Sequence, residues 1–251
     1  MTYATTFSGI GGWEIGLNAC GWNLKWQCEC DKFCRAVLKQ RYGVPIAPDI
    51  KSIIEWLSTE FGSIESAKID VLIGSPPCQP FSAAGKKRGV GDERHLYPAF
   101  IHAISILQPR YVLMENVAGL LSDRWAFGQY IGGLAALGYD IVWHCIPACA
   151  VGLPHRRDRV WIIANANGER CERRIQRIGE IKRDRHAEKD LHTSALELMR
   201  AGNDLPSPRI CRRSDGIPNF RERIKALGNA VVPQIPYIIG QAINEFELMN
   251  P

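Results

Sequence analysis

The feature that most limits how this chain can fold is an alternation, over residues 1–165, of short β-type runs with longer stretches of helical period. Two of the runs, DVLIG at 70–74 and YVLMEN at 111–116, are apolar in the way expected of strands buried on both faces. Alternating strands and helices predict an α/β fold built on an open parallel sheet. The expected strands lie at 3–7, 24–28, 71–73, 111–116, 141–146 and 160–164, and the expected helices contain 13–20, 33–41 and 97–107, with a fourth ending near 137–138.

The alternation stops at Asn165. Residues 168–205 are rich in Arg and Glu and have no clear strand period. A helical pattern resumes at Arg221 and runs to Leu248. Breaks in this pattern are expected at Gly228, Pro233 and Pro236. The chain therefore divides into the parts 1–165, 166–218 and 219–251.

Composition excludes several classes of protein. With 251 residues, 46% of them hydrophobic and 23% charged, the chain is expected to be globular rather than disordered or fibrous. It has no run of about 18 uncharged apolar residues, and its first residues do not resemble a signal peptide, so a soluble cytoplasmic protein is expected. The nine cysteines, an odd number without regular spacing, are expected to be free thiols in a reducing cell.

Positive charge is concentrated in the middle of the chain. Residues 166–213 hold 12 Lys and Arg against 8 Asp and Glu, which accounts for +4 of the net charge of +5. A basic surface of this kind can contact the phosphates of a nucleic acid. A solvated helical surface has the same composition, so charge alone leaves both interpretations open.

A glycine-rich segment, FSGIGG at 7–12, lies between the first expected strand and the first expected helix. Glycines at such a junction let a ligand approach the backbone and the start of the helix. Glu29 follows Gly12 by 17 residues (29 − 12), at the end of the second expected strand, where a carboxylate can bind a ribose diol. The spacing G-x-G-G disfavours a nicotinamide dinucleotide, and on this segment alone a purely structural turn stays open.

A second segment, GSPPCQPFS at 74–82, directly follows a buried strand. Its prolines stiffen the loop that carries Cys78 at the carboxyl edge of the sheet, where open α/β sheets bind ligands. Cys78 is therefore a candidate nucleophile. For most of the other eight cysteines, a small buried apolar residue is the simpler interpretation.

These segments and several others occur in the order found in DNA cytosine-5 methyltransferases, and the chain resembles that family over its whole length except the middle part. The matching motifs are FSGIGG at 7–12, Glu29, Asp49-Ile50, GSPPCQPFS at 74–82, Arg94, ENV at 115–117, HRRDRV at 155–160 and GNAVVP at 228–233. The resemblance implies a Rossmann-like, S-adenosylmethionine-dependent methyltransferase sheet with helices on both faces and a small target-recognition insert.

The resemblance implies a covalent mechanism on a flipped cytosine. The Cys78 thiolate would add to C6, and Glu115 would hold or protonate N3. Asn116 would help to fix the loop. Arg157 would stabilise developing negative charge, and Arg159 would have an orienting role and pair with Glu115. Because Arg157 and Arg159 are two residues apart, both are expected to point to one side of an extended segment. C5 would then take the methyl group, before the C5 proton and Cys78 leave.

The resemblance also implies contacts to S-adenosylmethionine. Phe7 would pack on the adenine, Glu29 would bind the ribose hydroxyls, and Asp49 with Ile50 would contact the adenine. Asn229 would come from a C-terminal helix that folds back beside the first strand. The full set of expected cofactor-binding residues is Phe7, Gly9, Gly11, Gly12, Glu29, Asp49, Ile50, Pro77 and Asn229. No metal is expected.

The same resemblance assigns roles to the three parts of the chain. Residues 1–165 would bind the cofactor and carry catalysis, 166–218 would select the target sequence in double-stranded DNA, and 219–251 would return to the catalytic domain. The protein is expected to be monomeric, in a prokaryotic or phage-infected cell, and a cognate restriction endonuclease could belong to the same system. Three positions depart from the family's pattern: Cys30, where a large apolar residue is usual, His155 in place of Gln, and Ala230, where serine is often found.

Three alternatives stay open. One is a zinc site built from Cys28, Cys30 and Cys34 or from His144, Cys145, Cys149 and His155, although neither spacing matches a standard finger. A second is methylation of tRNA, because one branch of the family shares the Pro-Pro-Cys-Gln-Pro-Phe run. The third is a non-catalytic nucleic-acid-binding relative, which the presence of Cys78, Glu115 and Arg157 disfavours.

Overall fold

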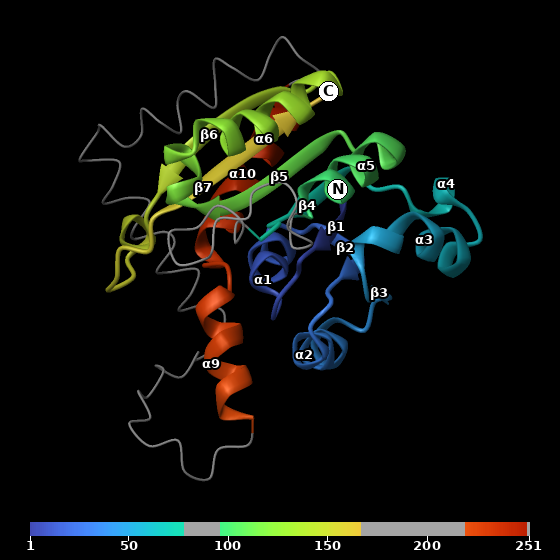
Figure 1. Cartoon of the computed structure of the whole chain (residues 1–251), viewed down its shortest axis with the longest axis horizontal. Coiled ribbons are helices and arrows are strands. Elements are labelled where there is room, and N and C mark those ends of the chain that lie inside the picture. Colours follow the sequence, from blue (N-terminus) through green and yellow to red (C-terminus); the bar gives the residue numbers. More distant parts are fainter. Residues whose placement is uncertain (78–95, 167–218, 250–251) are drawn as a thin grey trace.

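The computed structural model of the chain describes residues 1–77, 96–166 and 219–249, and their centre is a seven-stranded sheet in the order β3-β2-β1-β4-β5-β7-β6 (Figure 1). The strands are β1 Thr2–Thr6, β2 Asn23–Cys28, β3 Ile46–Ala47, β4 Val71–Gly74, β5 Tyr111–Val117, β6 Asp140–Ile146 and β7 Arg159–Asn165. The helices are α1 Gly12–Ala19, α2 Lys32–Tyr42, α3 Ile53–Phe61, α4 Ile64–Ala67, α5 Tyr97–Leu107, α6 Arg124–Ala136, α9 Phe220–Asn229 and α10 Gln234–Met249. Three short 3-10 helices are η1 Ile50–Ser52, η3 Ala118–Ser122 and η4 Ala148–Val151.

The sheet carries a hydrophobic core on each face, because successive residues of a strand point to opposite sides. In β4, Val71 and Ile73 join one core and Leu72 joins the other. Helices α1 and α10 cover the first face, for example through Leu17 and Ile239, and α3, α5 and α6 cover the second (Figure 1). The expected α/β sheet with helices on both faces is confirmed. None of the helices described is long and apolar enough to cross a membrane.

The expected parallel sheet is present except at one edge, where the strand direction differs. Strands β3, β2, β1, β4 and β5 run parallel, but β7 is antiparallel to both β5 and β6. Between β6 and β7 the chain forms only the short helix η4, so no crossover helix returns it to the other end of the sheet, as a parallel pairing would require. As a result, the first residue of β7, Arg159, pairs with Val117 at the end of β5.

The C-terminal part folds back onto the start of the chain, as expected, but as two helices. Helix α9 ends at Asn229 and α10 begins at Gln234, so residues 230–233, the last of which is Pro233, separate the two helices. Helix α10 contains Pro236 in its first turn, where a missing N–H costs no helical hydrogen bond. It packs on α1 closely enough that a Cβ at Gly16 would lie 2.8 Å from the backbone nitrogen of Tyr237.

Candidate active site

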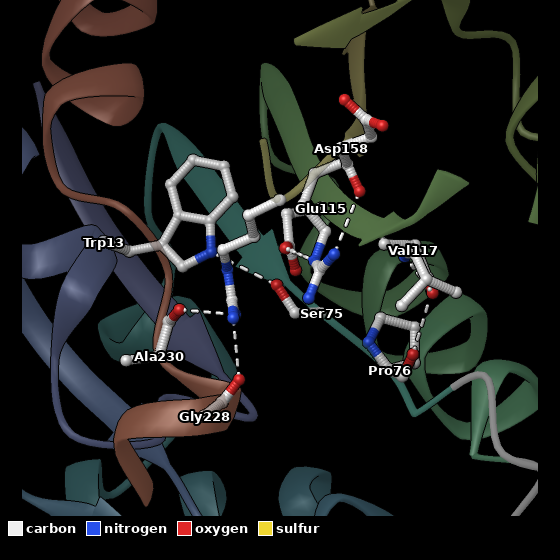
Figure 2. A network of polar contacts seen from close by, with 11 residues as sticks. Trp13, Ser75, Pro76, Glu115, Val117, Asp158, Gly228 and Ala230 are labelled. Carbon is white, nitrogen blue, oxygen red and sulfur yellow. Dashed lines mark hydrogen bonds and ion pairs between the residues drawn. The ribbon is translucent and has the colours of Figure 1, made fainter. Parts of the chain in front are cut away.

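Several predicted site residues gather at the edge of the sheet where β4 and β5 end (Figure 2). Glu115 lies near the end of β5, and the segment Ser75–Pro76–Pro77 follows β4 directly. Since β7 runs antiparallel, its first residue, Arg159, comes to this same edge. The unexpected strand direction therefore places a cation beside the carboxylate of Glu115.

Glu115 and Arg159 form a largely buried ion pair. Arg159 Nε lies 2.9 Å from Glu115 Oε1, and the two side chains are 21% and 10% exposed. The predicted pairing of these residues is thus present. Burial raises the pKa of Glu115 above its ordinary value, while the nearby charges of Arg159 and Arg157 and a hydrogen bond from Ser75 oppose that rise. Burial and the neighbouring charges thus act on the pKa of Glu115 in opposite directions.

Arg157 lies outside β7 and adopts a left-handed backbone conformation, with φ of 37°. The expectation that Arg157 and Arg159 both point to one side of an extended segment is therefore wrong in its premise, since that rule applies only to β backbone. Its guanidinium donates hydrogen bonds of 2.8 Å to the carbonyl oxygens of Gly228 and of Ala230, marked by dashed lines in Figure 2. Arg157 thus ties the edge of the sheet to the C-terminal segment, and burial together with the charge of Arg159 lowers its pKa.

Asn116 fixes the loop that leads to the predicted nucleophile. Its amide Nδ2 donates to the carbonyl oxygen of Pro76 at 3.0 Å, and its Oδ1 accepts from the backbone N–H of Val117 at 2.9 Å. These two hydrogen bonds join the end of β5 to the segment after β4. The first described range of the chain ends at Pro77, so the next residue, Cys78, lies outside the described residues.

Sequence reasoning missed two side chains beside Glu115. The indole Nε1 of Trp13, on α1, donates to Ser75 Oγ at 3.2 Å (Figure 2). Ser75 follows Gly74, which pairs with Met114 across the sheet, so its side chain lies beside Glu115 and lowers the pKa of that carboxyl group. Ser75 belongs to the GSPPC motif, so its position after a buried strand was the available signal. Nothing in the local sequence indicates that Trp13 reaches it.

The glycine-rich segment forms a tight loop between β1 and α1. Phe7, Gly9 and Gly11 all have left-handed backbone conformations, with φ of 56°, 58° and 92°. The carboxylate of Glu29 lies against this loop, accepting from the backbone N–H of Gly9 and from that of Asp31, each at 2.8 Å. The structure thus brings Glu29 to the glycine loop, as a nucleoside-binding site requires.

Gly12 allows the C-terminal segment to touch the same loop. A Cβ at Gly12 would lie only 2.4 Å from the carbonyl oxygen of Val231, two residues after Asn229.

The predicted pair Asp49-Ile50 follows β3, the neighbour of β2, but its two members differ in exposure. Ile50 is buried, whereas Asp49 is exposed and caps η1 by accepting from the backbone N–H of Lys51 at 3.0 Å.

A buried carboxyl group that sequence reasoning also missed lies below the loop. Glu14 Oε1 accepts from Thr5 Oγ1 at 2.6 Å and from Gln27 Nε2 at 2.5 Å. Glu14 Oε2 and Gln27 Oε1, both acceptors, have no hydrogen-bond partner within the part of the chain that the structure describes. Burial raises the pKa of Glu14, while its hydrogen bonds from Thr5 and Gln27 oppose that rise.

The zinc alternative finds no support. Both sets of Cys and His residues lie in the described ranges, where no three His, Cys, Asp or Glu side chains form a group able to hold a metal ion. Burial instead raises the pKa of Cys28 and brings that of Cys34 to about 12, as expected of protonated thiols in a core.

Comparisons with known proteins agree with the motif order. A sequence model of the C-5 cytosine-specific DNA methylase family matches residues 1–212. The Type II methyltransferase M.AquIA of Picosynechococcus sp. is 32% identical over 180 residues, which is 65% of this chain and 71% of that protein. M.MthTI, a Type II methyltransferase of Methanothermobacter thermautotrophicus, is 30% identical over 166 residues, 65% of this chain and 48% of that protein.

Solved structures share the fold. The S. pombe Dnmt2 methyltransferase superposes with a TM-score of 0.56 at 19% identity, over 67% of this chain and 52% of that one. An E. coli chain described as a prophage-encoded DNA modification methyltransferase gives a TM-score of 0.55 at 27% identity, over 66% and 46%. Apart from M.AquIA, the chain thus matches only about half the length of these relatives.

Proposed function

Because the chain belongs to the C-5 cytosine-specific DNA methylase family, we propose that it transfers a methyl group from S-adenosylmethionine to C5 of cytosine in a specific sequence of double-stranded DNA. The observation that carries this proposal is the buried Glu115–Arg159 ion pair, set beside the Pro76–Pro77 segment that leads to Cys78. A carboxyl group with a raised pKa next to the loop of a nucleophile is what activation of a pyrimidine ring requires.

The reaction needs the C5 carbon of cytosine to become electron-rich. The Cys78 thiolate forms a bond to C6, and Glu115 places its proton at N3, so that the electron pair of the C5–C6 double bond becomes available at C5. S-adenosylmethionine, when bound, supplies the electrophilic methyl group. After transfer, a base removes the C5 proton, the C6–sulfur bond breaks and the Cys78 thiolate leaves, and N3 returns its proton to Glu115. The target base must be out of the duplex stack for either side chain to reach it.

The residues at the glycine loop fit this cofactor. Gly9 has open space where a Cβ would lie, so a ligand can approach the backbone of the loop. The Glu29 carboxylate uses backbone donors on both of its oxygens and retains lone pairs for the two hydroxyl groups of a ribose. Phe7 and the exposed carboxylate of Asp49 supply an aromatic ring and an acceptor for an adenine. Asn229 completes the set from the C-terminal side.

The guanidinium of Arg157 connects the two halves of this proposed site. It holds the backbone on both sides of Asn229, through the carbonyl oxygens of Gly228 and Ala230. It also contributes positive charge to the surroundings of Glu115. We therefore assign Arg157 two tasks, stabilising negative charge that develops on the base and keeping Asn229 at the cofactor.

The remaining assignments concern the whole protein. Residues 1–165 form the catalytic domain, residues 166–218 select the target sequence and residues 219–251 return to the catalytic domain. Of the second part, the structure describes residue 166 alone. Duplex DNA is the substrate partner, and the enzyme acts as a monomer in the cytoplasm of a prokaryotic or phage-infected cell. A restriction endonuclease of the same system is its expected counterpart, as the names of its Type II relatives suggest.

Bisulfite sequencing tests this proposal. DNA from a host free of cytosine methylation is compared after expression of the natural chain, Cys78→Ala, or the control Cys149→Ala, which alters an exposed thiol. Cytosines protected at one short sequence are expected with the natural chain and the control, and unprotected cytosines with Cys78→Ala, although both variants should still bind S-adenosylmethionine. Methylation by Cys78→Ala would refute the covalent step. A soluble natural chain that binds the cofactor but protects no cytosine in DNA would refute the DNA substrate, and incubation with tRNA would then identify the alternative.

A further inference from the structure

Three side chains from separate parts of the chain, Trp13, Ser75 and Glu115, lie next to one another at this edge of the sheet (Figure 2). Trp13 lies in the first turn of α1, Ser75 follows β4, and Glu115 lies in β5. Trp13 Nε1 donates to Ser75 Oγ at 3.2 Å. Gly74 pairs with Met114 across β4 and β5, so the next residues, Ser75 and Glu115, lie side by side, and the Ser75 side chain lowers the pKa of Glu115. Neither Trp13 nor Ser75 has a role in the chemistry described above.

The direction of each hydrogen bond follows from the chemistry of the groups. An indole N–H can only donate, so Ser75 Oγ must accept from Trp13. The single hydroxyl proton of Ser75 is then left for the carboxyl group of Glu115. Arg159 Nε holds Oε1 of the same carboxyl group at 2.9 Å. Two donors, Arg159 at the start of β7 and Ser75 directly after β4, can therefore fix the plane in which Glu115 presents its oxygens.

Trp13 is itself held rigidly. Its side chain is only 2% exposed and packs edge-on against Trp161, with ring centroids 5.2 Å apart. Trp161 is the β7 residue that pairs with Glu115 across the sheet. The helix that carries Trp13 starts at Gly12, the last residue of the glycine loop. The position of Ser75 is thus tied to the same loop that the proposed function assigns to the cofactor.

We propose that Ser75 and Trp13 are positioning residues, which orient the Glu115 carboxyl group toward N3 of the target cytosine and link its orientation to the cofactor loop. The proposal rests on the proposed function, because it gives Glu115 its role in methyl transfer. Ser75 acts directly on the carboxyl group, and Trp13 acts through Ser75. Neither side chain has to touch the base.

Removing the hydroxyl group should have two separable effects. Ser75→Ala deletes a hydrogen bond that favours the ionised form, so the pKa of Glu115 should move further above its ordinary value. It also releases the orientation of the carboxyl group, so kcat should fall roughly tenfold or more while KM for DNA stays near the natural value. If the protonated form of Glu115 is the active one, the alkaline limb of the pH profile moves to higher pH. Ser75→Thr keeps a hydroxyl group and should restore both properties.

Trp13→Phe separates orientation from packing. It keeps an aromatic ring against Trp161 but removes the donor to Ser75 Oγ. The expected result is an intermediate loss of kcat, because Ser75 can still donate but its hydroxyl is no longer fixed. Ser105→Ala is the matched control, since it removes an exposed serine hydroxyl from α5. It should leave kcat, KM and the pH profile unchanged.

The test combines kinetics with a readout that does not depend on activity. Carbon-13 NMR of protein labelled at glutamate carboxyl carbons follows the titration of Glu115, with Glu115→Gln used to assign its resonance. An upward shift of the Glu115 titration in Ser75→Ala, restored in Ser75→Thr, is the expected result. An active natural enzyme in which Ser75→Ala changes neither the titration nor kcat overturns this inference and leaves the proposed function standing. A natural enzyme without activity refutes the proposed function, while the titration still decides whether Ser75 acts on Glu115. Should Ser75→Ala not fold, an unchanged kcat in Trp13→Phe would overturn the inference instead.

Discussion

The contact between Gly12 and Val231 allows a prediction to be worked out in detail. In Gly12→Ala, the new Cβ would lie 2.4 Å from the carbonyl oxygen of Val231 and 3.0 Å from its backbone nitrogen. The obstacle is backbone, so no side-chain rotation relieves it, and the segment after α9 must move away from α1. Overpacking of this kind typically costs about 1–3 kcal/mol. Because Gly12 is the first residue of its helix, the gain in helix propensity offsets little of this.

For a chain of this size, a loss of about 1–3 kcal/mol lowers Tm by roughly 2–12 °C. Circular dichroism on heating measures this, with and without S-adenosylmethionine, and the stabilisation by cofactor should also shrink because Asn229 moves with the displaced segment. Gly132→Ala is the control. Gly132 lies inside α6 with nothing within 4 Å of a new Cβ, so alanine should raise stability by up to about 1 kcal/mol. The reasoning is refuted if Gly12→Ala melts at or above the natural temperature.

Three further predictions concern charged groups. Burial raises the pKa of Glu14, so the contribution of Glu14 to stability is complete below its unfolded pKa and is lost as pH rises through its folded pKa. In urea unfolding, the natural chain should therefore lose stability relative to Glu14→Gln as pH rises, by at most about 1.4 kcal/mol per pH unit. Parallel plots of unfolding free energy against pH for the two chains would contradict this. Arg157→Lys can hold only one of two backbone carbonyls, so calorimetry should show roughly tenfold weaker binding of S-adenosylmethionine, whereas Arg156→Lys, at a side chain 84% exposed, should bind normally. Lys225→Ala removes an exposed ion pair with Asp31 and should lower the free energy of unfolding in urea by less than about 1 kcal/mol, a difference that vanishes in high salt. A larger loss of stability that does not depend on salt would show that the pair is more than a surface interaction.

The elements that sequence predicts well are those whose pattern is local. Strands β4 and β5 are buried on both faces and read as continuous apolar runs, and α1, α2 and α5 show helical spacing. The direction of β7 is not local, because it depends on which strand it pairs with. Strand β3 and helices α3 and α4 were not predicted. Strand β3, with two residues, and helix α4, with four, are too short for their apolar residues to show a period.

The candidate site divides in the same way. Motif order identifies Glu115, Asn116 and Arg159 because each lies at a fixed place after or within a strand. The left-handed backbone of Arg157 carries no sequence signal, since it is a non-glycine residue held by contacts with a distant segment. Ser75 and Glu14 were missed for a related reason, because their partners come from other strands and helices. Such partners emerge only when the chain is folded.

The return of α10 to α1 also has a consequence for how the molecule is made. Trp22 donates to Asn244 at 2.7 Å across a separation of 222 positions, and Leu17 of α1 packs in one core with Ile235, Ile239 and Ile243 of this late segment. During translation, the glycine loop and its helix therefore leave the ribosome long before the residues that cover them. A nascent chain is expected to expose that apolar face to chaperones and to remain unable to retain S-adenosylmethionine. Cofactor retention by ribosome-bound chains of increasing length would then mark the moment at which synthesis reaches α10.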